Sequence, residues 1–162
     1  MKKLCALIVV IGVLCGCGFQ LRGETKLAFA SLYIDGATAS PVALDLRRFI
    51  ESSGTTRITD KVEQAQASLQ VLSETREKII LSLTGGGKVR EFQLRERVSF
   101  RLADSKNQDL IPLNEIVVSR VVSFNDTQVL AKESEEALLY RDMQNDAVQQ
   151  ILRRLAAVKR PA

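Results

Sequence analysis

Residues 92–102 read Phe-Gln-Leu-Arg-Glu-Arg-Val-Ser-Phe-Arg-Leu, and this stretch is the main evidence for the fold class. Apolar and polar side chains alternate along it: Phe92, Leu94, Val98, Phe100 and Leu102 on one side, with Gln93, Arg95, Arg97, Ser99 and Arg101 on the other. Alternation with a period of two is typical of a strand with one buried face. We therefore predict a long strand in a sheet that is covered on one side.

Further strand-like stretches flank this one. Residues 67–73 and 78–83 also look extended, and three consecutive glycines, 85–87, then form a turn signal. Polar residues 104–109 predict a second turn before residues 111–124, which are rich in isoleucine and valine. Two successive hairpins predict a mainly antiparallel meander.

Two helices are predicted from capping residues and from apolar periodicity. Ser40 is placed as an N-cap, Pro41 as the first helical residue and Gly54 at the end, and the apolar face holds Val42, Leu46, Phe49 and Ile50. The second helix runs over about 134–157, with Tyr140, Met143, Ala147, Ile151 and Leu155 on one face.

The order of these elements predicts an α+β fold. A short strand at 31–35 precedes the first helix, so the chain crosses back onto the sheet through that helix. We expect two helices packed on one face of a mainly antiparallel or mixed sheet of about four strands. Residues 31–162 are predicted to form this single domain.

The N-terminus has the composition of an export signal. Lys2 and Lys3 precede an apolar run over 4–14, which is too short to span a bilayer. Leu14-Cys15-Gly16-Cys17 resembles a lipobox, the signature at which lipoprotein signals are cleaved. We expect residues 1–16 to be removed, Cys17 to carry diacylglycerol and an N-acyl chain, and 17–30 to be a lipidated N-terminal segment.

Composition excludes several function classes. The chain has no histidine, and Cys17 is the only cysteine left after cleavage, so histidine triads, thiol nucleophiles and the common zinc sites are excluded. A net charge of +4, which falls further without Lys2 and Lys3, gives no support to nucleic-acid binding. We expect no catalytic residue, no metal and no cofactor besides the lipid on Cys17.

Basic residues follow the glycine turn and line one side of the long strand. Lys88 and Arg90 do not belong to a phosphate-binding P-loop, because Ser82 and Val89 stand where that motif needs Gly and Ser or Thr. They are instead expected to form an anion-contacting hairpin tip. Arg95, Arg97 and Arg101 share one face, which is either a solvated sheet face or a surface for a partner or an anionic ligand.

Several segments together resemble the LptE family of lipopolysaccharide-assembly lipoproteins. Cys17-Gly18-Phe19-Gln20-Leu21-Arg22-Gly23 resembles the family's opening, and Arg90-Glu91-Phe92-Gln93-Leu94 is similar to its strand after the turn. Leu130-Ala131-Lys132 is similar to the segment that precedes the family's last helix, and Tyr140-Arg141-Asp142-Met143 is similar to that helix itself. The resemblance spans nearly the whole chain after the signal.

This resemblance implies a fold of helices on a mixed sheet and a binding role without chemistry. Family members plug the outer-membrane β-barrel LptD, help it assemble and take part in delivering lipopolysaccharide to the outer leaflet. Candidate contacts to the phosphates of lipopolysaccharide are Lys132, which matches a family position, Lys88, Arg90 and Arg95. Gly18 in place of an aspartate implies an outer-membrane anchor on the periplasmic side.

Two other functions remain open at this stage. The chain could be an envelope-scaffold lipoprotein of another outer-membrane assembly machine. An enzyme, such as a wall-cleaving hydrolase using Glu or Asp, would need a carboxyl group of raised pKa in a cleft, and the sequence shows none.

Overall fold

The computed structural model describes residues 27–36, 39–124 and 129–159. The predicted signal and Cys17 lie outside these residues. The elements in chain order are β1 (Ser31–Asp35), α2 (Pro41–Ser53), β2 (Arg57–Thr59), the 3₁₀ turn η1 (Val62–Gln64), β3 (Ala67–Leu83), β4 (Val89–Asp104), β5 (Asp109–Ser123) and α3 (Val129–Ala156).

The five strands form one mixed sheet in the order β2-β1-β3-β4-β5. β1 runs parallel to both β2 and β3, whereas β3, β4 and β5 are antiparallel. The α+β prediction is confirmed, and β2 is the strand that the sequence pattern did not reveal. A strand of three residues is too short to display a period of two.

The strand β3 is continuous over the region where two separate extended stretches were predicted. Glu74, Arg76 and Lys78 interrupt the apolar alternation there, yet they pair in register with the buried Val98, Glu96 and Leu94 of β4. These charged side chains therefore lie on the same face of the sheet as the core, in its less covered half.

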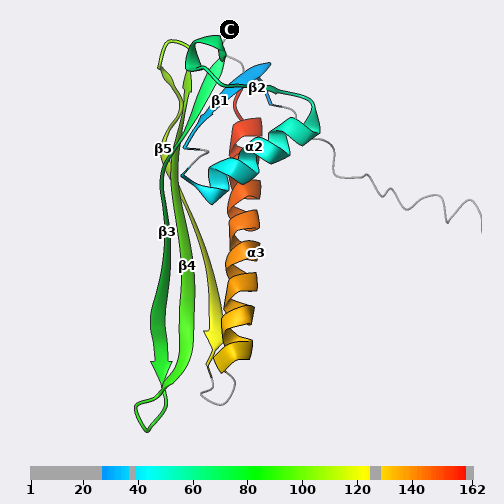
Figure 1. Ribbon diagram of the computed structural model, residues 1–162. Coiled ribbons are helices and arrows are strands. Elements are labelled where there is room, and N and C mark those ends of the chain that lie inside the picture. Colours follow the sequence, from blue (N-terminus) through cyan, green and yellow to red (C-terminus); the bar gives the residue numbers. More distant parts are fainter. Residues whose placement is uncertain (1–26, 37–38, 125–128, 160–162) are drawn as a thin grey trace, which may run out of the picture.

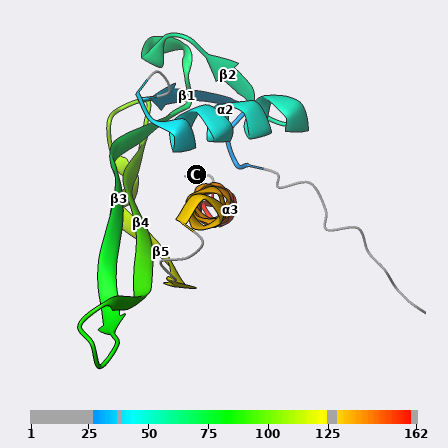
Figure 2. The same cartoon turned by 60° about the horizontal axis from the view of Figure 1, so that its bottom comes forward.

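Both helices lie on one face of the sheet, as predicted (Figures 1 and 2). The long α3 runs along the sheet, and α2 crosses at the end that holds β1 and β2. Ser40 caps α2 by accepting a hydrogen bond from Ala43 N, and Gly54 ends it in the left-handed conformation at φ 64°. Phe49 is the exception on the predicted apolar face, because it lies beside the buried stripe and is 38% exposed.

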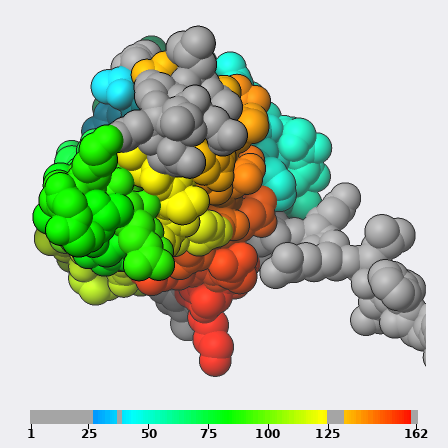
Figure 3. Space-filling model, turned by 90° about the horizontal axis from the view of Figure 1, so that it is seen from below, coloured from blue at the N-terminus to red at the C-terminus, as the bar shows by residue number. Residues whose placement is uncertain are grey.

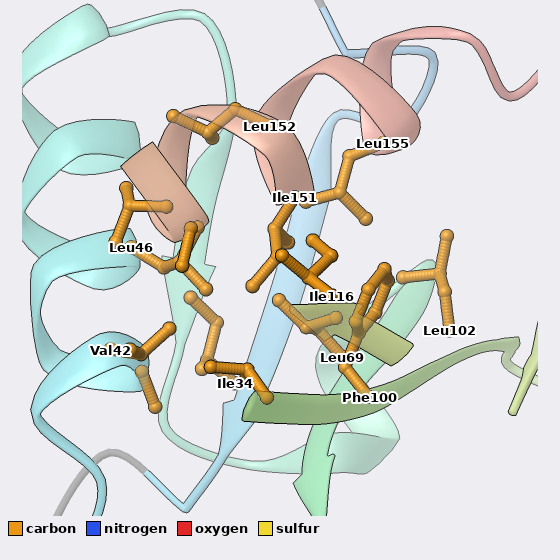
Figure 4. Close-up of a cluster of buried hydrophobic side chains, with 14 of the residues drawn as sticks. Ile34, Val42, Leu46, Leu69, Phe100, Leu102, Ile116, Ile151, Leu152 and Leu155 are labelled. Atoms are coloured by element: carbon orange, nitrogen blue, oxygen red, sulfur yellow. The ribbon is translucent and has the colours of Figure 1, made fainter. Parts of the chain in front are cut away.

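The hydrophobic core lies where α2, α3 and the sheet meet (Figure 4). Leu69 from β3, Phe100 and Leu102 from β4 and Ile116 from β5 form the sheet side. They pack with Val42 and Leu46 of α2 and with Ile151 and Leu155 of α3. Among the described residues, no helix is long and apolar enough to cross a membrane.

A cluster of polar side chains, here called the polar joint, connects both helices to the sheet at the edge of this core. The Glu74 carboxylate accepts hydrogen bonds from Ser40 Oγ at 2.6 Å and from the Val42 amide at 3.2 Å. Arg76 donates to Glu96 Oε1 at 3.1 Å and to Gln144 of α3 at 2.6 Å. The polar joint thus ties α2 to β3, and β3 to β4 and α3.

Candidate functional site

Beyond the polar joint the molecule consists of β3, β4, β5 and the N-terminal half of α3, and we call the far end of this part the distal end (Figure 1). It includes the hairpin between β3 and β4, the last residues of β5 and the first turns of α3. In the view from below, yellow β5 lies between the green hairpin and orange α3 (Figure 3). Three predicted site residues belong to this end.

A cavity of about 250 Å³ lies at the distal end, between the sheet and α3. Its floor is apolar and consists of Phe92, Leu94, Val122 and Phe124. The rings of Phe92 and Phe124 meet edge to face, with centroids 5.4 Å apart. Leu94 and Val122 are buried, whereas the two phenylalanines are half-buried, so the floor opens toward the end of the molecule.

Charged side chains form the rim of this distal cavity. Lys78 Nζ lies 4.5 Å from the centre of the Phe92 ring and pairs with Glu136 of α3 at 2.5 Å. Lys132 Nζ pairs with Glu135 at 2.7 Å, and Glu133 completes the rim. An ammonium group over an aromatic ring is attracted by the ring's electrons, which helps to hold Lys78 above the floor.

Lys132, Lys88 and Arg90 are brought to this same end. Lys132 is on the rim itself, and its side chain is 19% exposed. The carbonyl of Arg90 accepts a hydrogen bond from the amide of Phe124 at 2.8 Å, which places Arg90 beside the cavity floor. Its side chain is exposed and forms no ion pair within the described part of the chain.

The glycine segment forms the hairpin turn that the sequence predicted. Thr84 N donates to Lys88 O at 2.7 Å, and Gly87 N donates to Thr84 O at 2.9 Å. Gly87 has φ 77°, a conformation that side-chain-bearing residues rarely adopt. Lys88 therefore directly follows a tight turn at the tip of the hairpin.

Arg95 lies apart from this group, on the face of the sheet that no helix covers. Its guanidinium lies 3.5 Å from Glu77 on β3, and it also donates to Gln93. Arg97 pairs with Glu115 in the same way, and Arg101 pairs with Asp109. The arginine stripe is thus a solvent-facing row in which each arginine is paired with a carboxylate of a neighbouring strand or turn.

Sequence reasoning missed Lys78, Phe124 and Glu136, which complete the distal cavity. Phe124 could have been found, because it continues the alternation Val118, Val122 on the buried side of β5. Lys78 and Glu136 carried no such signal, since a charged residue in a strand or helix usually faces solvent. No group of three side chains that could hold a metal ion is present among the residues that the structure describes.

Comparison with known proteins places the chain in context. The sequence model of the family described as "LptE: Lipopolysaccharide-assembly" matches residues 29–155. The LPS-assembly lipoprotein LptE of Pectobacterium atrosepticum is 28% identical over 161 residues, which cover 96% of this chain and 86% of the relative. That of Yersinia enterocolitica is 29% identical, over 90% of this chain and 71% of the relative.

Solved structures show the same architecture. The solution structure of a lipoprotein B from Nitrosomonas europaea, described as uncharacterized, has 45% identity and a TM-score of 0.76, covering 86% of this chain and 91% of the other. The rare lipoprotein B of Shewanella oneidensis gives a TM-score of 0.67 at 24% identity over 78% of this chain and 92% of the other, and so supports the fold.

Proposed function

Because this chain belongs to the LptE family of lipopolysaccharide assembly, we propose that it is an outer-membrane lipoprotein that plugs and helps assemble an LptD-like barrel. In that position it takes part in delivering lipopolysaccharide to the outer leaflet, by binding and without chemistry. The barrel partner is inferred from the family alone, and the ligand also from the geometry of the distal end.

The single observation that supports ligand contact is the combination of cations and apolar surface at the distal end. Lys78 and Lys132 lie at the rim of an apolar floor, and Arg90 lies beside it. Lipopolysaccharide combines phosphates with acyl chains, so it requires both kinds of surface. Charge-assisted hydrogen bonds from Lys and Arg to phosphate are about twice as strong as neutral ones.

The proposed lipid on Cys17 serves to keep the protein at the membrane. Each buried methylene contributes about 0.8 kcal/mol, and a single acyl chain gives only marginal binding. Two or three chains on one cysteine would anchor the domain stably, while the folded body supplies the contacts to barrel and ligand.

Co-purification tests the barrel assignment. The full-length chain, tagged at its C-terminus and expressed in a Gram-negative host that lacks its own LptE, is extracted in mild detergent. We expect a large outer-membrane barrel identified as LptD, together with lipopolysaccharide, to be recovered with it. Recovery of the chain without a barrel would contradict the proposal and favour a scaffold of another machine.

Charge reversal tests the ligand assignment. We predict that Arg90→Glu and Lys132→Glu each weaken binding of purified lipopolysaccharide by roughly tenfold, since one charge-assisted hydrogen bond contributes about 1.5–3 kcal/mol. The matched control is Arg95→Glu, which reverses the same charge on the other face and should leave binding within about twofold. Binding is measured with the full-length chain by competition against a labelled lipopolysaccharide. Equal losses in all three variants would show non-specific attraction to the basic chain.

A further inference from the structure

The distal cavity has the size of a subsite for part of a molecule. Pockets that hold whole small-molecule ligands usually measure about 300–1,000 Å³. The distal cavity measures about 250 Å³, so it can take only one segment of a larger ligand. Its floor consists of four apolar side chains, so it favours an apolar segment of that ligand.

The apolar surface does not stop at the cavity. Ile80 pairs in register with Phe92 and so lies on the same face of the sheet, where its side chain is 55% exposed. An exposed apolar side chain next to an apolar cavity enlarges the surface that a ligand can contact, so Ile80 extends the floor outward.

The lysines at the mouth are held by pairs that a ligand can replace. Lys132 and Glu135 are three residues apart on α3, and their side chains are 19% and 49% exposed, so the pair is open to solvent on the Glu135 side. Pairs of this kind contribute little to stability, typically less than 1 kcal/mol. Hydrogen bonds from lysine to carboxylate and to phosphate are both charge-assisted, so a phosphate can take the place of Glu135 at Lys132.

We propose that the distal cavity receives one acyl chain of an anionic amphiphile, whose anionic group is bound at the mouth by Lys78 and Lys132. The natural source of the chain is lipopolysaccharide, and this part of the inference rests on the function proposed above. Phe92 and Phe124 contact the chain, Leu94 and Val122 form the base of the cavity, and Ile80 extends the contact outward.

Photolabelling tests this proposal with a defined probe. Dodecyl phosphate with a diazirine at the end of its alkyl chain is added below its micellar concentration to the purified full-length chain, and the labelled residues are mapped by mass spectrometry. We expect the label on the cavity floor, and competition by lipopolysaccharide but not by an anionic phospholipid at equal concentration. Label spread evenly over the surface, or competition by the phospholipid alone, would overturn the proposal.

Two neighbouring residues of β5 provide a matched pair of variants. Val122→Trp fills the cavity and should reduce labelling at least tenfold, whereas Val121→Trp adds the same volume on the opposite face, where Val121 is 56% exposed, and should not. Unchanged labelling in a folded Val122→Trp would overturn the proposal. If that variant does not fold, Lys132→Gln replaces it and should weaken binding of the phosphate probe roughly tenfold, but not of a dodecyl maltoside probe.

The same variants separate this proposal from the broader function. If the Val122→Trp variant still binds lipopolysaccharide and the barrel normally, the acyl-chain site is overturned and the proposed function stays intact. In another outcome, the wild type is not labelled by the probe and Val122→Trp no longer recovers the barrel. That result would overturn the lipid assignment and would indicate that a side chain of the partner protein fills the cavity.

Discussion

Glu96 shows how a single residue departs from the pattern around it. It occupies an inward position of β4 between Leu94 and Val98, and it is fully buried. Burial raises the pKa of the Glu96 carboxyl above its ordinary value of about 4.5, and the attraction of Arg76 only partly opposes this. One carboxyl oxygen, Oε2, has no hydrogen-bond partner within the described chain.

A carboxyl group whose pKa is raised by folding destabilises the protein as it ionises. Below the unfolded-state pKa of about 4.5 the carboxyl group is protonated in both the folded and the unfolded state, so its ionisation does not lower the unfolding free energy. As the pH rises through the raised pKa, the folded state must carry a buried charge, so stability is lost. Glu96→Gln removes the titration and keeps the shape of the side chain.

We therefore predict that Glu96→Gln gains stability relative to the wild type as the pH rises from 4.5 to 7. Urea unfolding of both proteins at several pH values in this range measures the difference in unfolding free energy. A difference that stays constant with pH, or that changes in favour of the wild type, would contradict the prediction.

Ser40 joins helix capping to the polar joint. Its hydroxyl oxygen accepts from Ala43 N at 3.1 Å, and the same hydroxyl donates to Glu74 at 2.6 Å. We predict that Ser40→Ala lowers the unfolding free energy by about 1–2 kcal/mol, because both bonds are lost. Ser52→Ala, which removes an exposed hydroxyl at the other end of α2, should cost less than about 0.5 kcal/mol. Equal costs in urea unfolding would refute the role of Ser40.

At the scale of elements, the helices were predictable because their signals are local. The Ser40 cap, Pro41 and Gly54 define α2 within 15 consecutive residues, and α3 repeats its apolar side chains along one face. The single strand β3 was not predictable in the same way. Arg76 and Lys78 face inward there, and they find their partners on β4 and α3, far away in the sequence.

The buried face of α3 gives a test of helix packing. Met143, Ala147, Ile151 and Leu155 are all fully buried, as the periodicity predicted. Ala147 is the smallest of them, so Ala147→Leu adds volume to a closed core and should cost about 1–3 kcal/mol of unfolding free energy. Ala137→Leu makes the same change at an exposed position of α3 and should be nearly neutral. Thermal unfolding distinguishes the two, and a neutral Ala147→Leu would mean that α3 packs loosely.

At the scale of the whole molecule, the structure divides into a packed half and a narrow half. In the packed half, α2, β1, β2 and the C-terminal part of α3 pack together with the sheet. The distal end consists only of parts of β3, β4 and β5 and the start of α3. Lys88, Arg90 and Lys132 could be proposed from the sequence as anion contacts, and they do lie at one end. The sequence could not show that Arg95 lies apart from these three residues, because it does not reveal which face of the sheet the helices cover.

The distal cavity itself could not be predicted from the sequence. Its residues come from β3, β4, the end of β5 and α3, which only the register of the hairpins brings together. The position of Lys78 over the Phe92 ring and its ion pair with Glu136 of α3 depend on that register, and no local motif encodes them.

Site-specific crosslinking in the assembled complex tests most directly whether the distal end contacts the ligand. A photoreactive amino acid is placed singly at positions 90 and 132 of the full-length chain, and at position 95 on the opposite face as a control. After irradiation of living cells, adducts are identified with antibodies to the chain and to lipopolysaccharide. We predict lipopolysaccharide adducts from positions 90 and 132 and none from position 95. Adducts from position 95 alone, or from none of the three, would contradict a ligand site at the distal end.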